Sequence, residues 1–204
     1  MARAAALLSA AMLVAACGGG DDAPPVTDIT TEGALAFSKP ATFTIAGNAL
    51  DSSNINLATT GCRGLKMLPG GTPWQQQVTC TVTGVGTVQV EAKSADGALL
   101  LARSFHVPMP EVALQTTLGT LTLEFYPDKA LVTVFNFLAY VNAGFYDGTL
   151  FHRAVPGFVV QGGGYSSGLV YKKPIYNPIV LESSNGLSNV RGTLGMARGA
   201  AADT

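Results

Sequence analysis

The stretch FHRAVPGFVVQGGG, from Phe151 to Gly164, decides how the second half of the chain folds. Apolar residues on both sides of its Pro-Gly pair are typical of two short strands joined by a turn. The stretch contains neither a serine or cysteine nucleophile nor a metal-ligand spacing. Its one permanently charged group is an arginine among apolar residues. Any chemistry performed here therefore has to use a fixed cation.

The residues before this stretch predict a hairpin and a helix. Residues 112–117 and 120–125 alternate apolar and polar side chains around a Leu-Gly turn, which favours two paired strands. Pro127-Asp128 then opens a predicted helix, and Gly144 stands where a C-terminal glycine cap belongs. One apolar face recurs at helical spacing through Val134, Phe137, Leu138 and Val141.

Two long motifs, NFLAYVNAGFYDGTLFHRAVPGFVVQGGG and NGLSNVRGTLGMAR, resemble the cyclophilin-type peptidyl-prolyl cis–trans isomerases, especially the bacterial ones. The resemblance runs from about Val112 to the last residue. It implies a closed antiparallel barrel with two helices, and no metal or organic cofactor. Later family motifs, among them a Ser-Gln-Phe-Phe strand and the second helix, do not appear before Thr204. We therefore expect an incomplete cyclophilin-like antiparallel β-barrel with one helix over residues 110–204.

The resemblance also implies roles for individual residues. Arg153 matches the catalytic arginine, and Gln161 matches the residue that binds the substrate backbone. Phe158 and Met196 match the floor of the proline pocket. Ala197 and Arg198 match the strand that passes the substrate peptide, and His152 is expected to pack rather than react.

An arginine suits the isomerisation of an X–Pro bond. Amide resonance sets a barrier of about 18–20 kcal/mol, and no bond between heavy atoms has to break. In the twisted state the proline nitrogen becomes a hydrogen-bond acceptor, to which a guanidinium can donate. The first hypothesis is thus an isomerase that acts on proline-containing exported polypeptides. The alternative is a non-catalytic cell-envelope lipoprotein that binds peptides or surface partners.

The length of the chain bears on both hypotheses. A fragment of a longer protein and a naturally shortened chain are both open interpretations. Because two walls of the family pocket come from the absent motifs, we expect the 204-residue chain to be poorly active or inactive. A completed domain should be active through Arg153.

The first seventeen residues, MARAAALLSAAMLVAAC, predict a signal peptide. One arginine precedes an apolar stretch of about thirteen residues, which is too short to cross a bilayer. Residues 14–17, Val-Ala-Ala-Cys, resemble the bacterial lipobox, which implies cleavage before Cys17 and lipidation of its thiol. An ordinary signal peptide is the alternative. The resemblance implies a lipid-anchored protein of the cell envelope, facing the periplasm from the outer membrane in a Gram-negative host.

Between this leader and the cyclophilin-like segment we expect two further regions. Residues 18–30 are rich in Gly, Asp and Pro, which predicts a flexible linker. Residues 31–108 show several short alternating stretches separated by turn residues, which predicts a small β-sandwich that resembles immunoglobulin-like surface modules. The expected fold class is therefore mainly β. Trp74 is interpreted as a packing residue of this module.

The cysteines and the net charge bear on disulfide formation, metal binding and nucleic-acid binding. Cys62 and Cys80 are the two thiols that remain if Cys17 is lipidated, and an oxidising compartment favours a disulfide between them. Two cysteines without neighbouring histidines do not predict a metal site. The net charge is −1 and no basic stripe is present, so nothing indicates binding to nucleic acid. We expect a monomer without a membrane-spanning helix in the mature protein.

Overall fold

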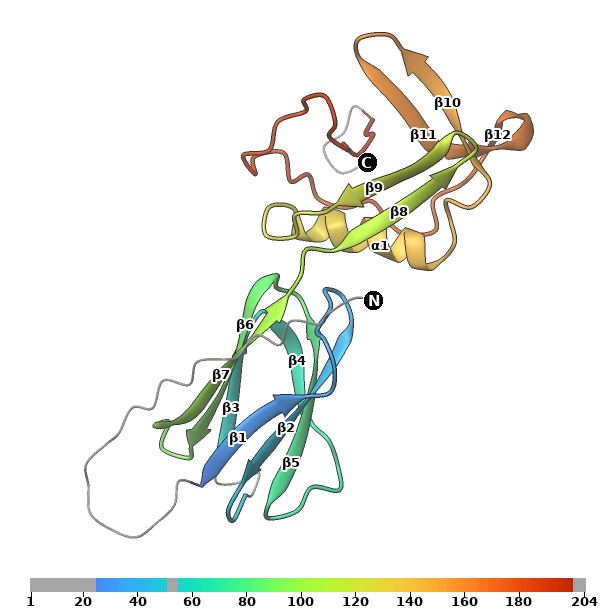
Figure 1. Ribbon diagram of the computed structural model, residues 1–204. Coiled ribbons are helices and arrows are strands. Elements are labelled where there is room, and N and C mark those ends of the chain that lie inside the picture. Colours follow the sequence, from blue (N-terminus) through green and yellow to red (C-terminus); the bar gives the residue numbers. More distant parts are fainter. Residues whose placement is uncertain (1–24, 51–54, 200–204) are drawn as a thin grey trace, which may run out of the picture.

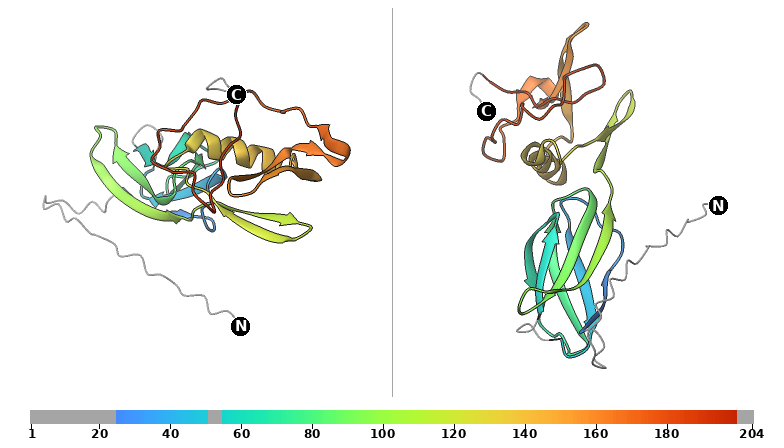
Figure 2. Two further views of the ribbon diagram at one scale, coloured as in Figure 1. Left: turned by 90° about the horizontal axis from the view of Figure 1, so that it is seen from above. Right: turned by 90° about the vertical axis from the view of Figure 1, so that its left-hand side faces the viewer.

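The computed structural model describes residues 25–50 and 55–199. These residues form two modules, which are stacked end to end and joined through residues 108–110 (Figures 1 and 2). The N-terminal module contains β1 (Val26–Thr31), β2 (Pro40–Gly47), β3 (Ile55–Thr60), β4 (Cys62–Met67), β5 (Gln75–Val82), β6 (Gly86–Ser94) and β7 (Leu99–Val107). The C-terminal module contains β8 (Glu111–Thr116), β9 (Gly119–Glu124), α1 (Leu131–Asn142), β10 (Thr149–Val155), β11 (Val159–Ser166), a 3₁₀ turn (Ser167–Leu169) and β12 (Val170–Tyr171).

The N-terminal module consists of two antiparallel sheets with one core between them. Strands run in the order β1-β2-β5-β4 in one sheet and β3-β6-β7 in the other. Alternate residues point inward, so that Phe43, Val78 and Val90 are fully buried. The rings of Phe43 and Phe105, one from each sheet, lie 5.1 Å apart. This two-layer packing buries the inner faces of both sheets, while the likeness of the module to immunoglobulin-like modules stays a prediction.

The predicted flexible linker is wrong for residues 26–30. These residues belong to β1, which pairs antiparallel with β2, and both Val26 and Ile29 are buried. Two apolar side chains on the inner face and the ladder with β2 outweigh the polar composition of the segment. The predicted signal peptide with Cys17, and residues 18–24 of the linker, lie outside the described residues.

The predicted disulfide is confirmed, whereas the packing role of Trp74 is wrong. Cys62 and Cys80 are bonded, with Cα atoms 5.8 Å apart, and connect the neighbouring strands β4 and β5. Trp74 lies in the turn before β5, and its side chain is 65% exposed. The backbone holds this turn, because the carbonyl of Trp74 accepts a hydrogen bond from the amide of Gly47 at 3.0 Å.

The helix of the C-terminal module begins later than its sequence predicts. It starts at Leu131, because residues 127–129 form a turn instead. Ala130 at the N-cap has no side chain that can accept a hydrogen bond from the first amides. At the other end Gly144 adopts the predicted left-handed conformation, with φ of 63°, and its amide donates to the carbonyl of Val141 at 3.0 Å. No described helix is long and apolar enough to cross a membrane.

The β-strands of the C-terminal module do not close into a barrel. Strands β8 and β9 form one two-stranded sheet, and β10, β11 and β12 form a separate one. The expectation of an incomplete antiparallel barrel with one helix is therefore confirmed in the described residues. The module contacts its neighbour through α1, where the rings of Phe37 and Phe135 are 4.7 Å apart. The core of the N-terminal module continues through this contact to Val134 and Phe125.

Candidate functional site

The hairpin of β10 and β11 brings together three of the predicted site residues. Arg153 on β10 pairs directly with Gln161 on β11, so both side chains lie on the same face. The guanidinium of Arg153 donates a hydrogen bond to the Gln161 side-chain oxygen at 3.3 Å. Phe158 lies in the connecting turn, and its ring centre is 5.9 Å from the Arg153 guanidinium carbon. The hairpin register thus groups a cation, an amide and an aromatic ring at one surface.

The glycines that follow Gln161 allow this hairpin to pack closely. A Cβ atom at Gly162 would lie 2.8 Å from a ring carbon of Phe151 on the facing strand. Gly163 has φ of 88° and would place a Cβ 3.1 Å from the ring of Tyr146. Because of these short distances, a larger residue at Gly162 or Gly163 would clash with the ring of Phe151 or Tyr146 and displace the strand. The glycine run therefore serves close approach of the backbone rather than phosphate binding.

Behind the hairpin lies a group of aromatic side chains. His152 packs on Tyr165 with ring centres 4.5 Å apart. Its Nδ1 atom is buried and has no hydrogen-bond partner. Tyr146 stacks on Phe137 of α1 at 5.1 Å. Burial, with a smaller contribution from Tyr140, raises the pKa of Tyr146 to about 12. These contacts fix the base of the hairpin and agree with a packing role for His152.

The other predicted site residues are not joined to this group. Met196, Ala197 and Arg198 lie in an irregular, exposed segment, and Met196 is 47% exposed. No described hydrogen bond, ion pair or ring contact connects them to Arg153, Gln161 or Phe158. The hydrogen bonds nearby are local, such as that from the amide of Thr193 to the carbonyl of Val190 at 3.2 Å. Their predicted roles at the substrate stay predictions.

Glu182 anchors the irregular segment that follows β12 to the helix. Its carboxylate accepts hydrogen bonds from the amides of Val132, at 3.2 Å, and Thr133, at 2.8 Å. It thereby replaces the missing N-cap side chain from fifty residues away in sequence. Burial acts to raise the pKa of Glu182, but the hydrogen bonds from Thr133 and Val132 outweigh it and lower the pKa. Sequence reasoning missed this contact because no local motif marks it.

The geometry defines a type of site. A guanidinium is held on a hairpin by an amide oxygen and lies near an aromatic ring, and Phe158 itself is 77% exposed. Such a face can donate hydrogen bonds to a polypeptide and contact its apolar side chains. It does not present a nucleophile beside a general base. The fold and the site together define a β-rich domain with an exposed arginine beside an aromatic ring.

Comparison with known families assigns this domain. Residues 111–204 match the family model described as cyclophilin type peptidyl-prolyl cis-trans isomerase. This part of the chain is therefore similar to the cyclophilin-type isomerase family, in agreement with the resemblance of the motifs around Arg153.

Individual relatives agree with the family model. Over 87 residues the chain is 52% identical to peptidyl-prolyl cis-trans isomerase A of Dickeya dadantii, which covers 43% of this chain and 45% of the relative. It is 44% identical over 102 residues to a peptidyl-prolyl cis-trans isomerase of Acinetobacter baylyi, covering 50% and 53%. With peptidyl-prolyl cis-trans isomerase B of Escherichia coli the identity is 47% over 87 residues, covering 43% and 52%. The chain thus spans about half the length of the curated relatives it matches.

Proposed function

We propose that the protein is a peptidyl-prolyl cis–trans isomerase whose catalytic residue is Arg153. The observation that carries the proposal is the hydrogen-bonded pair of Arg153 and Gln161, beside Phe158, inside a segment of the cyclophilin-type family. The names of its relatives support the same reaction. Substrates are polypeptides that contain X–Pro bonds.

The proposed mechanism needs only stabilisation of the twisted peptide. During rotation the lone pair of the proline nitrogen leaves amide resonance, and the Arg153 guanidinium donates a hydrogen bond to it. The hydrogen bond to Gln161 restrains the guanidinium before the substrate arrives, which limits the reorganisation needed in the transition state. The same amide group can donate from its nitrogen to a substrate carbonyl. Phe158 contacts the proline ring, and Met196 lines the pocket beside it.

To shorten X–Pro isomerisation from tens of seconds to milliseconds, an enzyme has to raise the rate by about 10⁴-fold. This corresponds to lowering the activation free energy by roughly 5.5 kcal/mol. A charge-assisted hydrogen bond contributes about 2–4 kcal/mol when its donor is preorganised. Orientation of the bound peptide supplies the remainder. Ala197 and Arg198 would provide this orientation by pairing with the extended substrate.

The test compares isomerisation of a short Ala-Pro peptide by the 204-residue chain, which should be poorly active, and by a chain with a completed isomerase domain and its variants. We expect Arg153→Ala to lower kcat/KM by about 10²–10³-fold, and Arg153→Lys to recover only part of it, because an ammonium lacks the planar fork. Arg63→Ala is the matched control, since Arg63 is exposed on β4 of the other module. Equal activity of Arg153→Ala and Arg63→Ala would contradict the mechanism.

A second function, peptide binding without catalysis, is favoured by the exposure of the site. Phe158 and Met196, the proposed floor of the proline pocket, are both exposed in the described residues. An open face of this kind holds a peptide without excluding water. Binding of an Ala-Pro peptide that is equally strong in Arg153→Ala, together with no acceleration by the unmodified protein, would support this function instead.

We also propose that the protein is a monomer anchored to the bacterial cell envelope by a lipid on Cys17. The motif at residues 14–17 and the disulfide between Cys62 and Cys80 support an exported protein. In a Gram-negative host the anchor would lie in the outer membrane. We expect Cys17→Ser to abolish incorporation of a labelled fatty acid and to release the protein from membranes. Label that persists in this variant would count against the anchor.

A further inference from the structure

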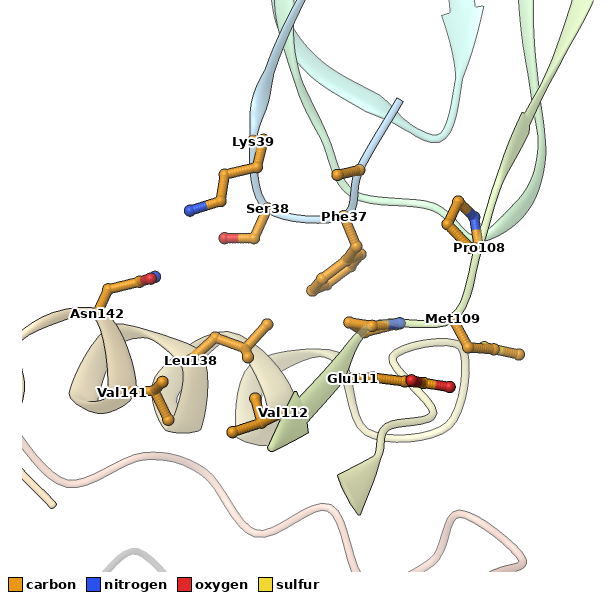
Figure 3. A pocket seen from close by; sticks show the side chains of 12 residues that line it. Phe37, Ser38, Lys39, Pro108, Met109, Glu111, Val112, Leu138, Val141 and Asn142 are labelled. Atoms are coloured by element: carbon orange, nitrogen blue, oxygen red, sulfur yellow. The ribbon is translucent and has the colours of Figure 1, made fainter. Parts of the chain in front are cut away.

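A pocket of about 460 Å³ lies where the two modules meet (Figure 3). Three segments line it: residues 36–39 between β1 and β2, the connection at residues 108–112, and residues 138–142 of α1. Its size falls in the range of about 300–1,000 Å³ that is typical of ligand sites. Arg153, Gln161 and Phe158 do not line it, so the proposed isomerase site leaves this pocket without a role.

The floor of the pocket is apolar and fixed. Leu138 and Val141 are one turn apart on α1, and Val112 of β8 lies beside them (Figure 3). Phe37 forms the opposite wall and is held by its contact with Phe135. Because this contact belongs to the continuous core of both modules, the floor keeps its shape without a ligand.

One end of the pocket carries hydrogen-bond donors. The side chains of Ser38 and Lys39 extend to the same end, and Asn142 points toward it from the helix (Figure 3). None of these three side chains takes part in a hydrogen bond or ion pair with another described residue. An ammonium, a hydroxyl and an amide can together hold one carboxylate.

The two ends of the pocket differ in loop geometry and in charge. Ser38 adopts φ of 65°, a left-handed conformation that is unfavourable for a residue other than glycine. Its amide donates to the carbonyl of Val82 at 2.9 Å, which holds the loop in this shape. At the other end Glu111 points outward and has no ion pair among the described residues (Figure 3). A carboxylate is attracted to the Lys39 end and repelled from the Glu111 end.

We propose that this pocket is a second peptide-binding site, which takes an extended polypeptide segment with an acidic residue flanked by apolar ones. The carboxylate binds at Ser38, Lys39 and Asn142, and a neighbouring apolar side chain lies against Leu138 and Val141. The choice of a polypeptide as occupant rests on the proposed isomerase function. The site would hold a client chain at a point separate from its X–Pro bond.

The experiment measures fluorescence anisotropy of a labelled peptide, Ala-Leu-Glu-Leu-Phe-Ala, titrated with the protein. The peptide lacks proline, so its binding is independent of catalysis at Arg153. We expect saturable binding that weakens about tenfold in Lys39→Glu, because reversing the charge replaces an attraction by a repulsion. Lys66→Glu, an exposed lysine on β4 outside the pocket, should change affinity less than twofold.

Variants of the peptide test whether its glutamate binds near Lys39, and a competitor tests whether the ligand of the pocket is a polypeptide. Replacing the glutamate of the peptide by glutamine should weaken binding to the unmodified protein, and replacing it by lysine should restore binding to Lys39→Glu. No binding, equal affinity for the glutamate and glutamine peptides, or equal effects of Lys39→Glu and Lys66→Glu would each overturn the proposal. Octanoate that competes at the affinity of the peptide would show that a small amphiphile, not a polypeptide, is the occupant. Loss of isomerase activity in Arg153→Ala is measured separately and leaves these outcomes unchanged.

Discussion

The two modules differ in where they place their apolar side chains. Among residues 25–50 and 55–199, all of the buried hydrophobic residues belong to the N-terminal module and its loops, except Phe125, Val134 and Tyr140. The C-terminal module instead exposes many large apolar side chains, among them Phe158, Val160 and Met196. One module closes two sheets over a core, and the other presents two separate small sheets around one helix.

Under the proposed function, this difference separates stability from recognition. Burial of apolar surface is the main source of folding free energy, so the N-terminal module supplies most of it. Exposed aromatic and aliphatic side chains near a fixed cation contribute little to folding but can contact a polypeptide. Substitutions in the first module should therefore change unfolding, and substitutions on the Arg153 face should change binding or turnover.

The largest expected effect comes from the core of the N-terminal module. Phe43→Ala removes a fully buried ring that packs on Phe105, and should lower the free energy of unfolding by about 3–5 kcal/mol. Urea denaturation followed by circular dichroism measures this change. Leu118→Ala is the control in the C-terminal module, because Leu118 is 98% exposed and should cost less than about 0.5 kcal/mol. Similar losses in both variants would remove the contrast between the modules.

The second effect is the contribution of the disulfide within the same module. Cys62 and Cys80 are separated by 18 residues, and a crosslink of this span stabilises by about 3 kcal/mol in the chain-entropy model. Urea denaturation with and without a phosphine reductant should show this loss. The double substitution Cys62→Ala and Cys80→Ala should abolish the sensitivity to reductant. If reduction leaves unfolding unchanged, the stability of the module rests on its core alone.

The sequence predicted the hairpin of β10 and β11 better than it predicted the details of the N-terminal module. The Pro-Gly turn predicted two paired strands, and the register that places Arg153 opposite Gln161 is seen only in the structure. The exposed position of Trp74 could not be read from its hydrophobicity, because the backbone of the turn decides where its side chain points. β1 was missed because pairing with β2 outweighs the polar composition of residues 26–30.

Contacts between segments distant in sequence were the least predictable. Neither the packing of Phe37 on Phe135 nor the hydrogen bonds from α1 to Glu182 has a local signature. Both contacts depend on how separate elements pack against each other in three dimensions. The hydrophobic periodicity of the sequence indicates secondary structure and carries no information on this packing. Predictions from pattern therefore describe the hairpin well and the connections of α1 poorly.

The smallest expected effect tests one of these connections in the C-terminal module. Glu182→Gln keeps the size of the side chain but removes the charge that accepts hydrogen bonds at the start of α1. We expect a loss of about 0.5–1 kcal/mol in the free energy of unfolding at pH 7, in line with a carboxylate at a helix N-terminus. Glu32→Gln, an exposed residue after β1 without a described partner, is the matched control. A similar loss in Glu32→Gln would attribute the effect to net charge rather than to capping.

The free energy of unfolding of the unmodified protein should differ from that of Glu182→Gln in a pH-dependent way, and this dependence tests whether the carboxylate causes the difference. The pKa of Glu182 is lower in the folded protein than its ordinary value of 4.5, because the amides of Thr133 and Val132 donate to the ionised form. A group with a lowered folded-state pKa stabilises the fold fully above its unfolded-state pKa, and this contribution disappears as the pH falls through the folded value. The stability difference between the unmodified protein and Glu182→Gln should therefore be constant from about pH 6 to 8 and shrink below about pH 4.5. Urea denaturation at a series of pH values measures it. A difference that persists unchanged at pH 3 would mean that Glu182 acts through packing, and that charge at the start of α1 does not stabilise the C-terminal module.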